Sequence, residues 1–114
     1  MATFERFAVV RVPFPFTDRT ASKNRPALVL SEVEAFNTPA GHSVMAMITS
    51  QDNAPWPLDC RIGDLAEAGL PAPSMIRFKL FTLDHRLVRG ELGKLSSNDA
   101  DAVRTALATL LGTT

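Results

Sequence analysis

Residues 12–31 read VPFPFTDRTASKNRPALVLS, and this stretch decides how the first part of the chain folds. An apolar strand, predicted over 9–12, enters a Pro-Phe-Pro-Phe corner that is followed by a polar loop. Arg25 then stands at the start of a second apolar strand, predicted over 27–30. Because proline lacks a backbone donor, the two prolines of the corner exclude a central ladder position and fix the direction in which the loop leaves. A rigid base, a basic tip and an arginine at the next strand are typical of a functional site carried on a loop.

Hydropathy patterns in the rest of the chain predict a β-rich body. A nearly continuous apolar run at 43–50 indicates a strand that is buried on both faces. Alternation at 75–82 indicates a half-buried strand, whose apolar face carries Ile76, Phe78 and Leu80. Weaker patterns predict a short strand at 56–61, a strand with two glycines at 86–95, and a helical turn at 32–37 that Pro39 and Gly41 end.

The C-terminal segment predicts a helix whose two ends are marked in the sequence. Ser96 followed by Asp99 matches a capping box, and Gly112 ends the helical pattern. Apolar residues recur at helical spacing, so we expect one face to pack on the sheet through Ala100, Val103, Ala106 or Leu107, and Leu110.

Length and composition describe one domain over residues 1–114. The chain has 46% apolar and 21% charged residues, which is ordinary for a soluble globular protein with a single core. Its one cysteine, Cys60, excludes an intrachain disulfide and is expected to be a small core residue. No segment has the composition of a signal peptide or a membrane span. We therefore expect a cytoplasmic protein with no membrane partner.

The net charge is zero, but the charges are unevenly distributed. Residues 1–31 and residues 77–94 each hold five basic and two acidic side chains, which gives +3 for each segment. Residues 32–76 hold one basic and six acidic side chains, which gives −5. If the fold brings the two basic segments together, they form a positive groove. If it does not, these side chains are solvated or paired with acids elsewhere, and the sequence leaves both interpretations open.

The sequence has none of the usual motifs of metal or nucleophilic catalysis. It contains no glycine-rich phosphate loop, no Cys-x-x-Cys, no His-Glu-x-x-His and no nucleophile elbow. His42 and His85 have no evident third partner, so no metal site and no cofactor are expected. Trp56 lies between two prolines, where it either stacks on a nucleic-acid base or packs against the protein.

The residues that remain suit phosphate chemistry without a metal. RNA can be cleaved by its own 2′-hydroxyl, provided that the protein handles two proton transfers and stabilises extra charge on phosphorus. The planar, always charged guanidinium of Arg25 matches phosphate oxygens, and the hydroxyls of Thr49 and Ser50 can bind the same group. Asp84 can accept a proton or hold a base edge. Each residue also has an ordinary structural role, so the set carries weight only if the fold brings its members together.

The chain resembles, over essentially its whole length, the PemK/MazF toxins of type II toxin–antitoxin systems. The resemblance is carried by Val12-Pro13-Phe14-Pro15-Phe16-Thr17-Asp18 and then by Lys23-Asn24-Arg25-Pro26-Ala27-Leu28-Val29-Leu30-Ser31. Further matching blocks lie at 47–50, 74–79, 83–84 and 93–96. The implied fold is mainly β with α (α+β): a small, strongly bent, barrel-like antiparallel sheet of the CcdB/MazF plasmid-toxin type with a long C-terminal helix.

The resemblance also implies a function. Members of the family are metal-independent endoribonucleases that cut single-stranded RNA, leave a 2′,3′-cyclic phosphate and a 5′-hydroxyl, act as homodimers and are neutralised by a cognate antitoxin. The family's catalytic arginine and threonine match Arg25 and Thr49, and Asp84 matches a carboxylate that some members use as an acid–base or RNA-contacting group. RNA contacts are expected from Ser50, Phe16, Thr17, Arg19, Lys23, Arg77 and Lys79.

The chain departs from the family pattern in two places. Phe7-Ala8 stand where the family commonly has aspartate after glycine or tryptophan, and Phe81-Thr82-Leu83 precede Asp84 where some members have an arginine. Arg77 or Lys79 would then supply any second cation. Two alternatives stay open: a non-enzymatic CcdB-like toxin that binds gyrase, although the sole tryptophan is not at the C-terminus, and a homologue that folds but no longer cuts.

Overall fold

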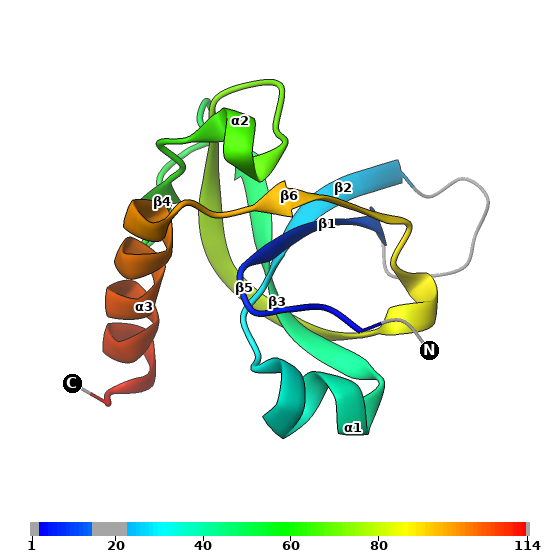
Figure 1. Cartoon of the computed structure of the whole chain (residues 1–114). Coiled ribbons are helices and arrows are strands. Elements are labelled where there is room, and N and C mark those ends of the chain that lie inside the picture. The colour runs from blue at the N-terminus through cyan, green and yellow to red at the C-terminus, as the bar shows by residue number, and fades with distance from the viewer. Residues whose placement is uncertain (1–2, 15–22, 114) are drawn as a thin grey trace.

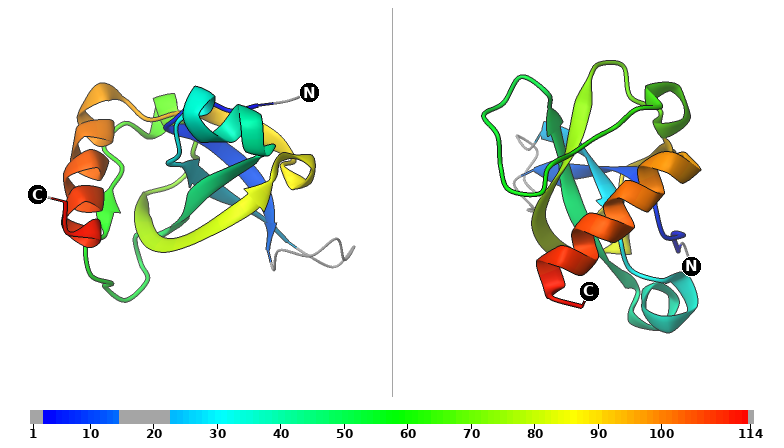
Figure 2. Two further views of the ribbon diagram at one scale, coloured as in Figure 1. Left: turned by 90° about the horizontal axis from the view of Figure 1, so that it is seen from below. Right: turned by 90° about the vertical axis from the view of Figure 1, so that its left-hand side faces the viewer.

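The computed structural model describes residues 3–14 and 23–113. Its centre is an antiparallel six-stranded sheet in the order β4-β5-β3-β2-β1-β6, which curls into half of a barrel (Figure 1). The strands are β1 (Ala8–Phe14), β2 (Lys23–Val29), β3 (His42–Ser50), β4 (Cys60–Arg61), β5 (Ser74–Asp84) and β6 (Gly90–Lys94). A long C-terminal helix, α3 (Ser97–Leu111), lies across one face of this sheet (Figure 2). The α+β class, the bent sheet and the terminal helix expected from the sequence are confirmed.

The first two strands form a hairpin whose prolines lie where a neighbouring strand has ended. Pro13 of β1 is opposite Asn24 of β2, while β6 pairs with β1 only from Ala8 to Arg11. Pro26 of β2 likewise precedes the first residue that pairs with β3. Neither missing N–H group therefore leaves a gap in a ladder, because each proline faces a strand edge on one side.

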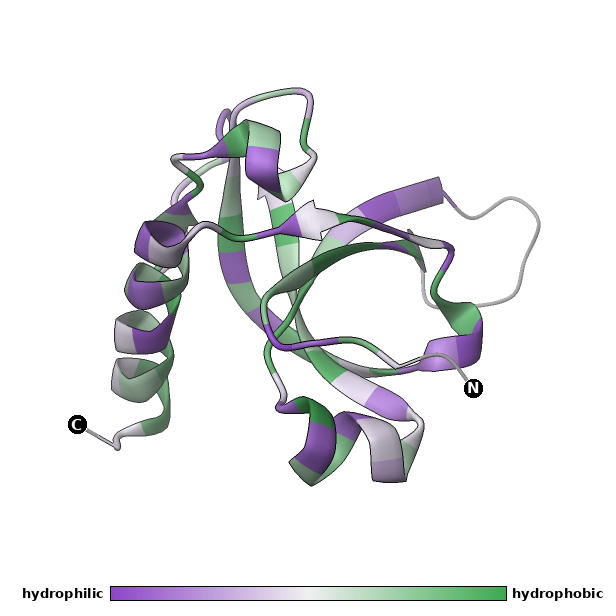
Figure 3. Cartoon of the chain, in the orientation of Figure 1, coloured by the Kyte–Doolittle hydropathy of each residue, from purple (hydrophilic) through white to green (hydrophobic). Residues whose placement is uncertain are grey.

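The core consists of two apolar layers, one on each face of the curled sheet. Alternate residues of the central strands enter different layers, as Val9 and Val10 do in β1. Strand residues are accordingly mostly apolar in Figure 3, whereas α3 presents alternating apolar and polar stripes. The layer beneath α3 contains Val9, Leu28, Ala46, Ile48, Ile76, Phe78, Ala100 and Val103, and the other layer contains Val10, Val12, Ala27, Val29, Met45 and Leu83.

The C-terminal helix has the predicted ends but uses Asp99 differently. Ser96 Oγ accepts the Asp99 N–H at 3.2 Å, and Gly112 ends the helix with φ of +72°. The carboxylate of Asp99 accepts the N–H groups of Gly63 and Asp64, at 2.9 and 3.0 Å. It therefore fastens α3 to the segment after β4. The expected packing of Leu110 is wrong, because that side chain is 41% exposed near the free end of the helix.

Strand β5 corrects a second expectation. Leu80 was expected on the buried face, but it is 41% exposed. The register on β3 jumps at this point, because Ala46 pairs with Leu80 whereas Met47 pairs with Arg77. The two extra residues form a bulge, which bends a strand away from its regular course. A bulge of this kind depends on the partner strand, so the alternating sequence did not reveal it.

Three weaker expectations need correction. The expected strand at 86–95 is a short helical turn, His85–Leu87, followed by β6, and the expected strand at 56–61 is only β4. The helical turn near 32–37 is found at Val33–Asn37, but the following α1 (Thr38–Ala40) includes Pro39. Proline is tolerated there because the first helical turn needs no donor, and Gly41 with φ of +66° ends the helix instead.

A short helix that the sequence analysis missed, α2 (Leu65–Ala68), packs directly on β6. Asp64 caps it by accepting the Glu67 N–H at 3.0 Å. A Cβ atom on Gly69 would lie 2.1 Å from the Leu92 carbonyl oxygen, and one on Gly93 would lie 2.3 Å from the Glu67 carbonyl oxygen. Glycine at both positions therefore allows helix and strand backbones to touch, and α2 positions the segment that follows it beside β2.

Candidate active site

The register between β2 and β3 brings Arg25 toward Thr49. The two strands pair at Ala27–Met47 and Val29–Met45, and two further residues in the same register place Arg25 opposite Thr49. Residues opposite each other in an antiparallel pair project from the same face. The ladder ends at Ala27 and Met47, and beyond it a pocket of about 230 Å³ opens that Arg25 and Thr49 both line. Two of the three residues expected to be catalytic, Arg25 and Thr49, are thus brought together.

The segment after α2 forms the other wall of this pocket. It contributes Leu70, Pro71, Ala72 and Pro73, while Ser50 and Ser74 pair at the adjoining ends of β3 and β5. A second depression of about 230 Å³ lies on the other side of Arg25 and is lined by Arg11, Asn24, Gly69 and Leu92. Arg25, Pro26, Leu70 and Pro71 border both depressions. Together they form one groove that crosses Arg25.

The guanidinium of Arg25 is exposed, and no acid in the described part of the chain neutralises it. Its Cζ lies 6.0 Å from the centre of the Phe14 ring, a cation–π distance. Within residues 3–14 and 23–113, Arg25 forms no ion pair with a carboxylate. Its charge is therefore available to an anion in the groove.

Thr49 is half-buried, and its hydroxyl is already oriented. The side-chain amide of Asn53 donates a hydrogen bond to Thr49 Oγ1. The threonine proton is left to donate into the pocket, because this contact uses the oxygen as an acceptor. Next to it, Ser50 Oγ accepts a hydrogen bond from the backbone N–H of Asp52 at 3.2 Å. The Ser50 hydroxyl therefore also keeps its proton for donation. Two hydroxyl donors therefore face the groove from the end of β3.

Sequence reasoning did not identify Asn53. It lies four positions after Thr49 in an exposed turn, and an asparagine in a turn is ordinarily a local backbone cap. Only the folded loop shows that its amide reaches the threonine. Arg11 and Asn24 were also not singled out as site residues, although both line the groove.

The two basic segments of the chain meet in part. Arg89 Nη1 donates to Asn24 Oδ1 at 2.8 Å, and the Arg89 N–H donates to the Arg11 carbonyl at the same distance. Lys23 begins β2 and is exposed beside this cluster. Arg11, Arg25 and Arg89 therefore gather at one end of the hairpin. The expectation of a positive groove is met in part by Arg11 and Arg25, which line the groove, whereas the alternative, pairing with acids elsewhere, holds for Arg77 and Arg86.

Arg77, which is expected from the sequence to contact RNA, holds a loop in the structure. Its guanidinium forms a two-point ion pair with Asp59, with Nη2–Oδ2 at 3.0 Å and Nε–Oδ1 at 3.3 Å. Nη2 also donates to the Ala54 carbonyl at 2.6 Å. Both side chains of the pair are nearly buried, at 13% and 12% exposed. Lys79 is also expected from the sequence to contact RNA, and its Nζ lies 4.7 Å from the centre of the Trp56 ring.

The structure does not bring Asp84 to the groove. Asp84 pairs with His42 at the start of β3, whereas Thr49 lies seven residues further along that strand, a separation of about 20 Å within one chain. Its carboxylate caps the following turn through the Arg86 N–H and forms an ion pair with the Arg86 guanidinium at 2.7 Å. These hydrogen bonds from Arg86 hold the pKa of Asp84 well below its usual range.

The remaining candidate residues have separate settings. Phe16, Thr17 and Arg19 lie outside the described residues. His85 is buried, with Nε2 2.7 Å from Ser43 Oγ and its ring edge-on to Phe4. Cys60 is half-buried against the apolar layer, and burial raises the pKa of its thiol, which disfavours the nucleophilic thiolate.

Two searches of the described chain identify no further site. Among residues 3–14 and 23–113, no group of three His, Cys, Asp or Glu side chains is arranged to hold a metal ion. Within the same residues, no helix is long and apolar enough to cross a membrane.

Comparison with known families gives one match over nearly the whole chain. Residues 5–111 match the family model of the PemK-like, MazF-like toxin of type II toxin–antitoxin systems. A comparison with curated proteins finds no significant match.

Solved structures share the fold. A MazE–MazF complex from Deinococcus radiodurans has 24% identity and a TM-score of 0.75, with all of both chains covered. An endoribonuclease in complex with its cognate antitoxin, from a mycobacterial species, has 22% identity and a TM-score of 0.76, with 100% of this chain and 98% of that chain covered. The toxin MazF-mt6 of Mycobacterium tuberculosis has 18% identity and a TM-score of 0.73, with 94% and 98% covered. At these identities the likeness supports the curled sheet and terminal helix.

Proposed function

The chain belongs to the PemK/MazF family of toxins of type II toxin–antitoxin systems, and from this premise we propose that it is a metal-independent endoribonuclease. Its substrate is single-stranded RNA, which lies in the groove that crosses Arg25. The observation that carries this proposal is that an arginine, which no carboxylate of the described residues neutralises, lines one pocket with an oriented threonine hydroxyl at the end of two adjacent strands. That combination suits a phosphate whose charge increases during the reaction.

The proposed reaction is an internal transfer on phosphorus. The 2′-oxygen of the RNA attacks the adjacent phosphate, the new P–O2′ bond forms and the P–O5′ bond breaks. Arg25 binds the phosphate oxygens through its planar fork and stabilises the extra negative charge of the transition state. The Thr49 hydroxyl donates a hydrogen bond to one phosphate oxygen and so holds the group in line for attack.

The two proton transfers involve different partners. Among residues 3–14 and 23–113, no carboxylate or histidine lines the two depressions beside Arg25. We therefore assign the loss of the 2′-hydroxyl proton to solvent, and the proton of the leaving 5′-oxygen to Arg25, which is re-protonated by water. The products are a 2′,3′-cyclic phosphate and a 5′-hydroxyl. Asp84 has no part in this scheme within one chain.

The partners are also part of the proposal. Two structural neighbours are described as MazE–MazF and endoribonuclease–antitoxin complexes, which supports a cognate antitoxin for this chain. We further propose that the toxin works as a cytoplasmic homodimer. Arg11 and Arg25, which line the groove, make it attractive to an acidic segment as well as to RNA.

The chemistry of the RNA ends tests the proposed function. Purified protein is incubated with unstructured RNA in excess EDTA, and the fragments are analysed for 2′,3′-cyclic phosphate and 5′-hydroxyl ends. We expect both ends, formed without added metal. A strict requirement for added metal, or the absence of cutting, would contradict the proposal. Induced expression separates the alternatives, because a ribonuclease fragments RNA, a gyrase-binding toxin causes DNA breaks, and an inactive homologue does neither.

A further inference from the structure

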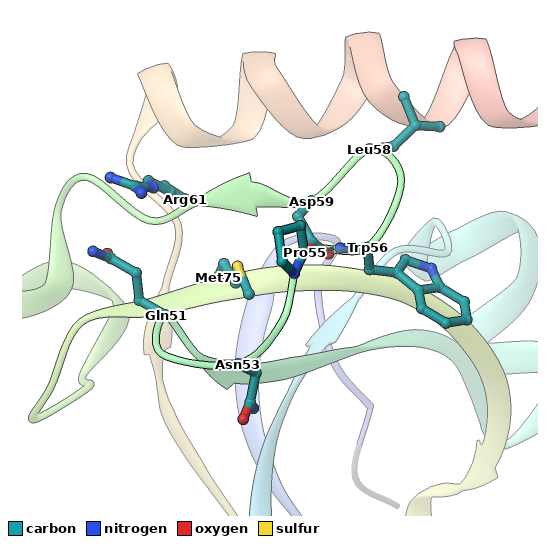
Figure 4. A pocket seen from close by; sticks show the side chains of 8 residues that line it. All are labelled: Gln51, Asn53, Pro55, Trp56, Leu58, Asp59, Arg61 and Met75. Atoms are coloured by element: carbon teal, nitrogen blue, oxygen red, sulfur yellow. Dashed lines mark hydrogen bonds between the residues drawn. The ribbon is translucent and has the colours of Figure 1, made fainter.

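The loop 51–59, which joins β3 to β4, presents the only tryptophan of the chain at the surface. Trp56 is 42% exposed. It borders a pocket of about 310 Å³ whose lining also includes Gln51, Asn53, Pro55, Arg61 and Met75 (Figure 4). The mechanism proposed above does not use this pocket.

The exposed ring stands on a rigid support. The backbone N–H of Trp56 donates to Asp59 Oδ2 at 2.9 Å, and the backbone N–H of Asp59 donates back to the Trp56 carbonyl at 3.2 Å. Asp59 is itself held by the two-point ion pair with Arg77, which also binds the Ala54 carbonyl. A nearly buried ion pair therefore fixes the backbone that carries an exposed indole. Hydrophobic packing does not explain why this backbone is held so firmly, because Trp56 remains 42% exposed to water.

The surroundings of the ring favour an anionic, aromatic ligand. Lys79 Nζ and Arg77 Cζ lie 4.7 and 5.8 Å from the ring centre. The Arg77 charge is matched by Asp59, whereas Lys79 forms no ion pair within the described part of the chain. An aromatic platform with an adjacent unmatched cation is the usual arrangement for a single-stranded nucleotide, whose base stacks while its phosphate meets the cation.

Asn53 links this pocket to the candidate active site. Asn53 lines it and at the same time donates its side-chain amide to Thr49 Oγ1. In Figure 4 the indole points away from Gln51 and Arg61, which lie at the opposite end of the pocket and can contact a base edge or a phosphate there. An RNA chain whose scissile phosphate is at Thr49 therefore has this pocket one side chain away.

We propose that loop 51–59 forms a nucleobase subsite in which an RNA base next to the cleaved bond stacks on Trp56, with Lys79 beside its phosphate. This inference rests on the proposed ribonuclease function. An antitoxin segment is the other conceivable occupant. The hydrogen bond that links Asn53 to Thr49 and the polar groups of the lining favour a base.

The single tryptophan allows a direct measurement, because the chain contains no tyrosine and its ultraviolet-excited emission comes mainly from Trp56. The probe is a random-sequence, single-stranded 12-mer RNA methylated at every 2′-oxygen, which cannot be cut. Inorganic polyphosphate serves as a control that carries charge without bases. We expect the RNA to quench Trp56 emission in a saturable way and polyphosphate to leave it nearly unchanged. RNA binding, measured by anisotropy of a labelled probe, without any change in Trp56 emission would overturn the subsite.

Variants give an independent result. Trp56→Ala should weaken binding of the methylated RNA by about 5- to 100-fold, because a base loses its stacking partner, and Trp56→Phe should restore most of the loss. Phe36→Ala is the matched control, since Phe36 is similarly exposed (38%) but lies in the turn before α1, and its binding should stay within twofold. Circular dichroism confirms that each variant folds.

The failures of the two proposals are distinguishable. If the wild-type chain binds no RNA, the ribonuclease proposal and this subsite fall together. If the wild-type chain binds and cuts RNA and Trp56→Ala does so equally well, only the subsite falls. If Trp56→Ala instead retains RNA cutting but escapes neutralisation by the antitoxin, the loop binds a protein segment and the nucleobase assignment is wrong.

Discussion

The side-chain amide of Asn53 donates a hydrogen bond to Oγ1 of Thr49 and so fixes the direction of the threonine proton. If Thr49 binds the scissile phosphate, Asn53→Ala should reduce the rate of RNA cleavage about five- to tenfold. This reduction corresponds to the free energy of one neutral hydrogen bond. The loss should appear mainly in kcat, because the hydroxyl is still present but is no longer oriented. Asp52→Ala is the control, since only its backbone N–H contacts Ser50. Unchanged cleavage by Asn53→Ala would show that Thr49 needs no orientation.

The ion pair between Arg77 and Asp59 should be a major contributor to stability. Arg77→Ala leaves a nearly buried carboxylate without its partner, and we expect the free energy of unfolding to fall by about 3 kcal/mol. Lys79→Ala, on the same strand but exposed, should change it by less than about 0.5 kcal/mol. Urea unfolding measures both. In a double-mutant cycle with Asp59→Ala, the two losses should be far from additive, and simple additivity would contradict the pairing.

Asp99 should stabilise the packing of α3 on the segment after β4. Asp99→Ala removes the acceptor of two backbone N–H groups, so we expect a loss of about 2 kcal/mol in the free energy of unfolding. Asp101→Ala, two residues along the same helix and exposed, provides the matched comparison and should have little effect. Equal stabilities of the two variants would exclude this role.

The placement of Asp84 predicts that Asp84→Asn retains RNA cleavage to within about threefold, a change of less than about 0.7 kcal/mol in activation free energy. Its carboxylate is bound to Arg86 at the opposite end of β3 from Thr49. The rate of cleavage of an unstructured RNA measures the effect. A loss of a hundredfold or more would show that Asp84 reaches the substrate, for example in an assembly of two chains.

The same ion pair predicts a pH dependence. Arg86 holds the pKa of Asp84 below its ordinary value near 4, so the folded state releases this proton more readily than the unfolded state. The stabilisation is complete above about pH 4 and is lost as the pH falls from there toward the lowered pKa. Arg86→Ala should therefore be less stable than the wild type at pH 7, and the difference should narrow in acid. NMR titration of the Asp84 carboxyl checks the cause, since its pKa should rise in Arg86→Ala.

Local sequence signals predicted the elements that are specified within a few residues. The cap at Ser96, the stop at Gly112 and the apolar runs of β1, β2 and β3 all lie in short segments. Contacts between distant segments could not be predicted in this way. The exposure of Leu80 follows from a bulge against β3, and the ion pair of Arg77 is made with an acid eighteen residues earlier, Asp59.

The candidate site shows the same division. Arg25 and Thr49 were singled out by residue type and by family resemblance, and the β2–β3 register then brought them to one pocket. Asp84 matched a carboxylate of the family by its position in the sequence. It lies nine residues beyond Met75 on β5, however, and therefore at the opposite end of that strand from the partner of Thr49. Asn53 has no sequence signal, because its contact exists only once the loop has folded.

The central claim, that Arg25 stabilises the charge that develops on the scissile phosphate, is tested most directly by cleavage of unstructured RNA in excess EDTA. Wild type and Arg25→Ala are compared, with Arg104→Ala as a matched loss of an arginine that pairs with Asp101 on α3. We predict that Arg25→Ala cuts at least about a hundredfold more slowly while remaining folded, and that Arg104→Ala cuts at close to the wild-type rate. Cleavage by Arg25→Ala at the wild-type rate would contradict the account.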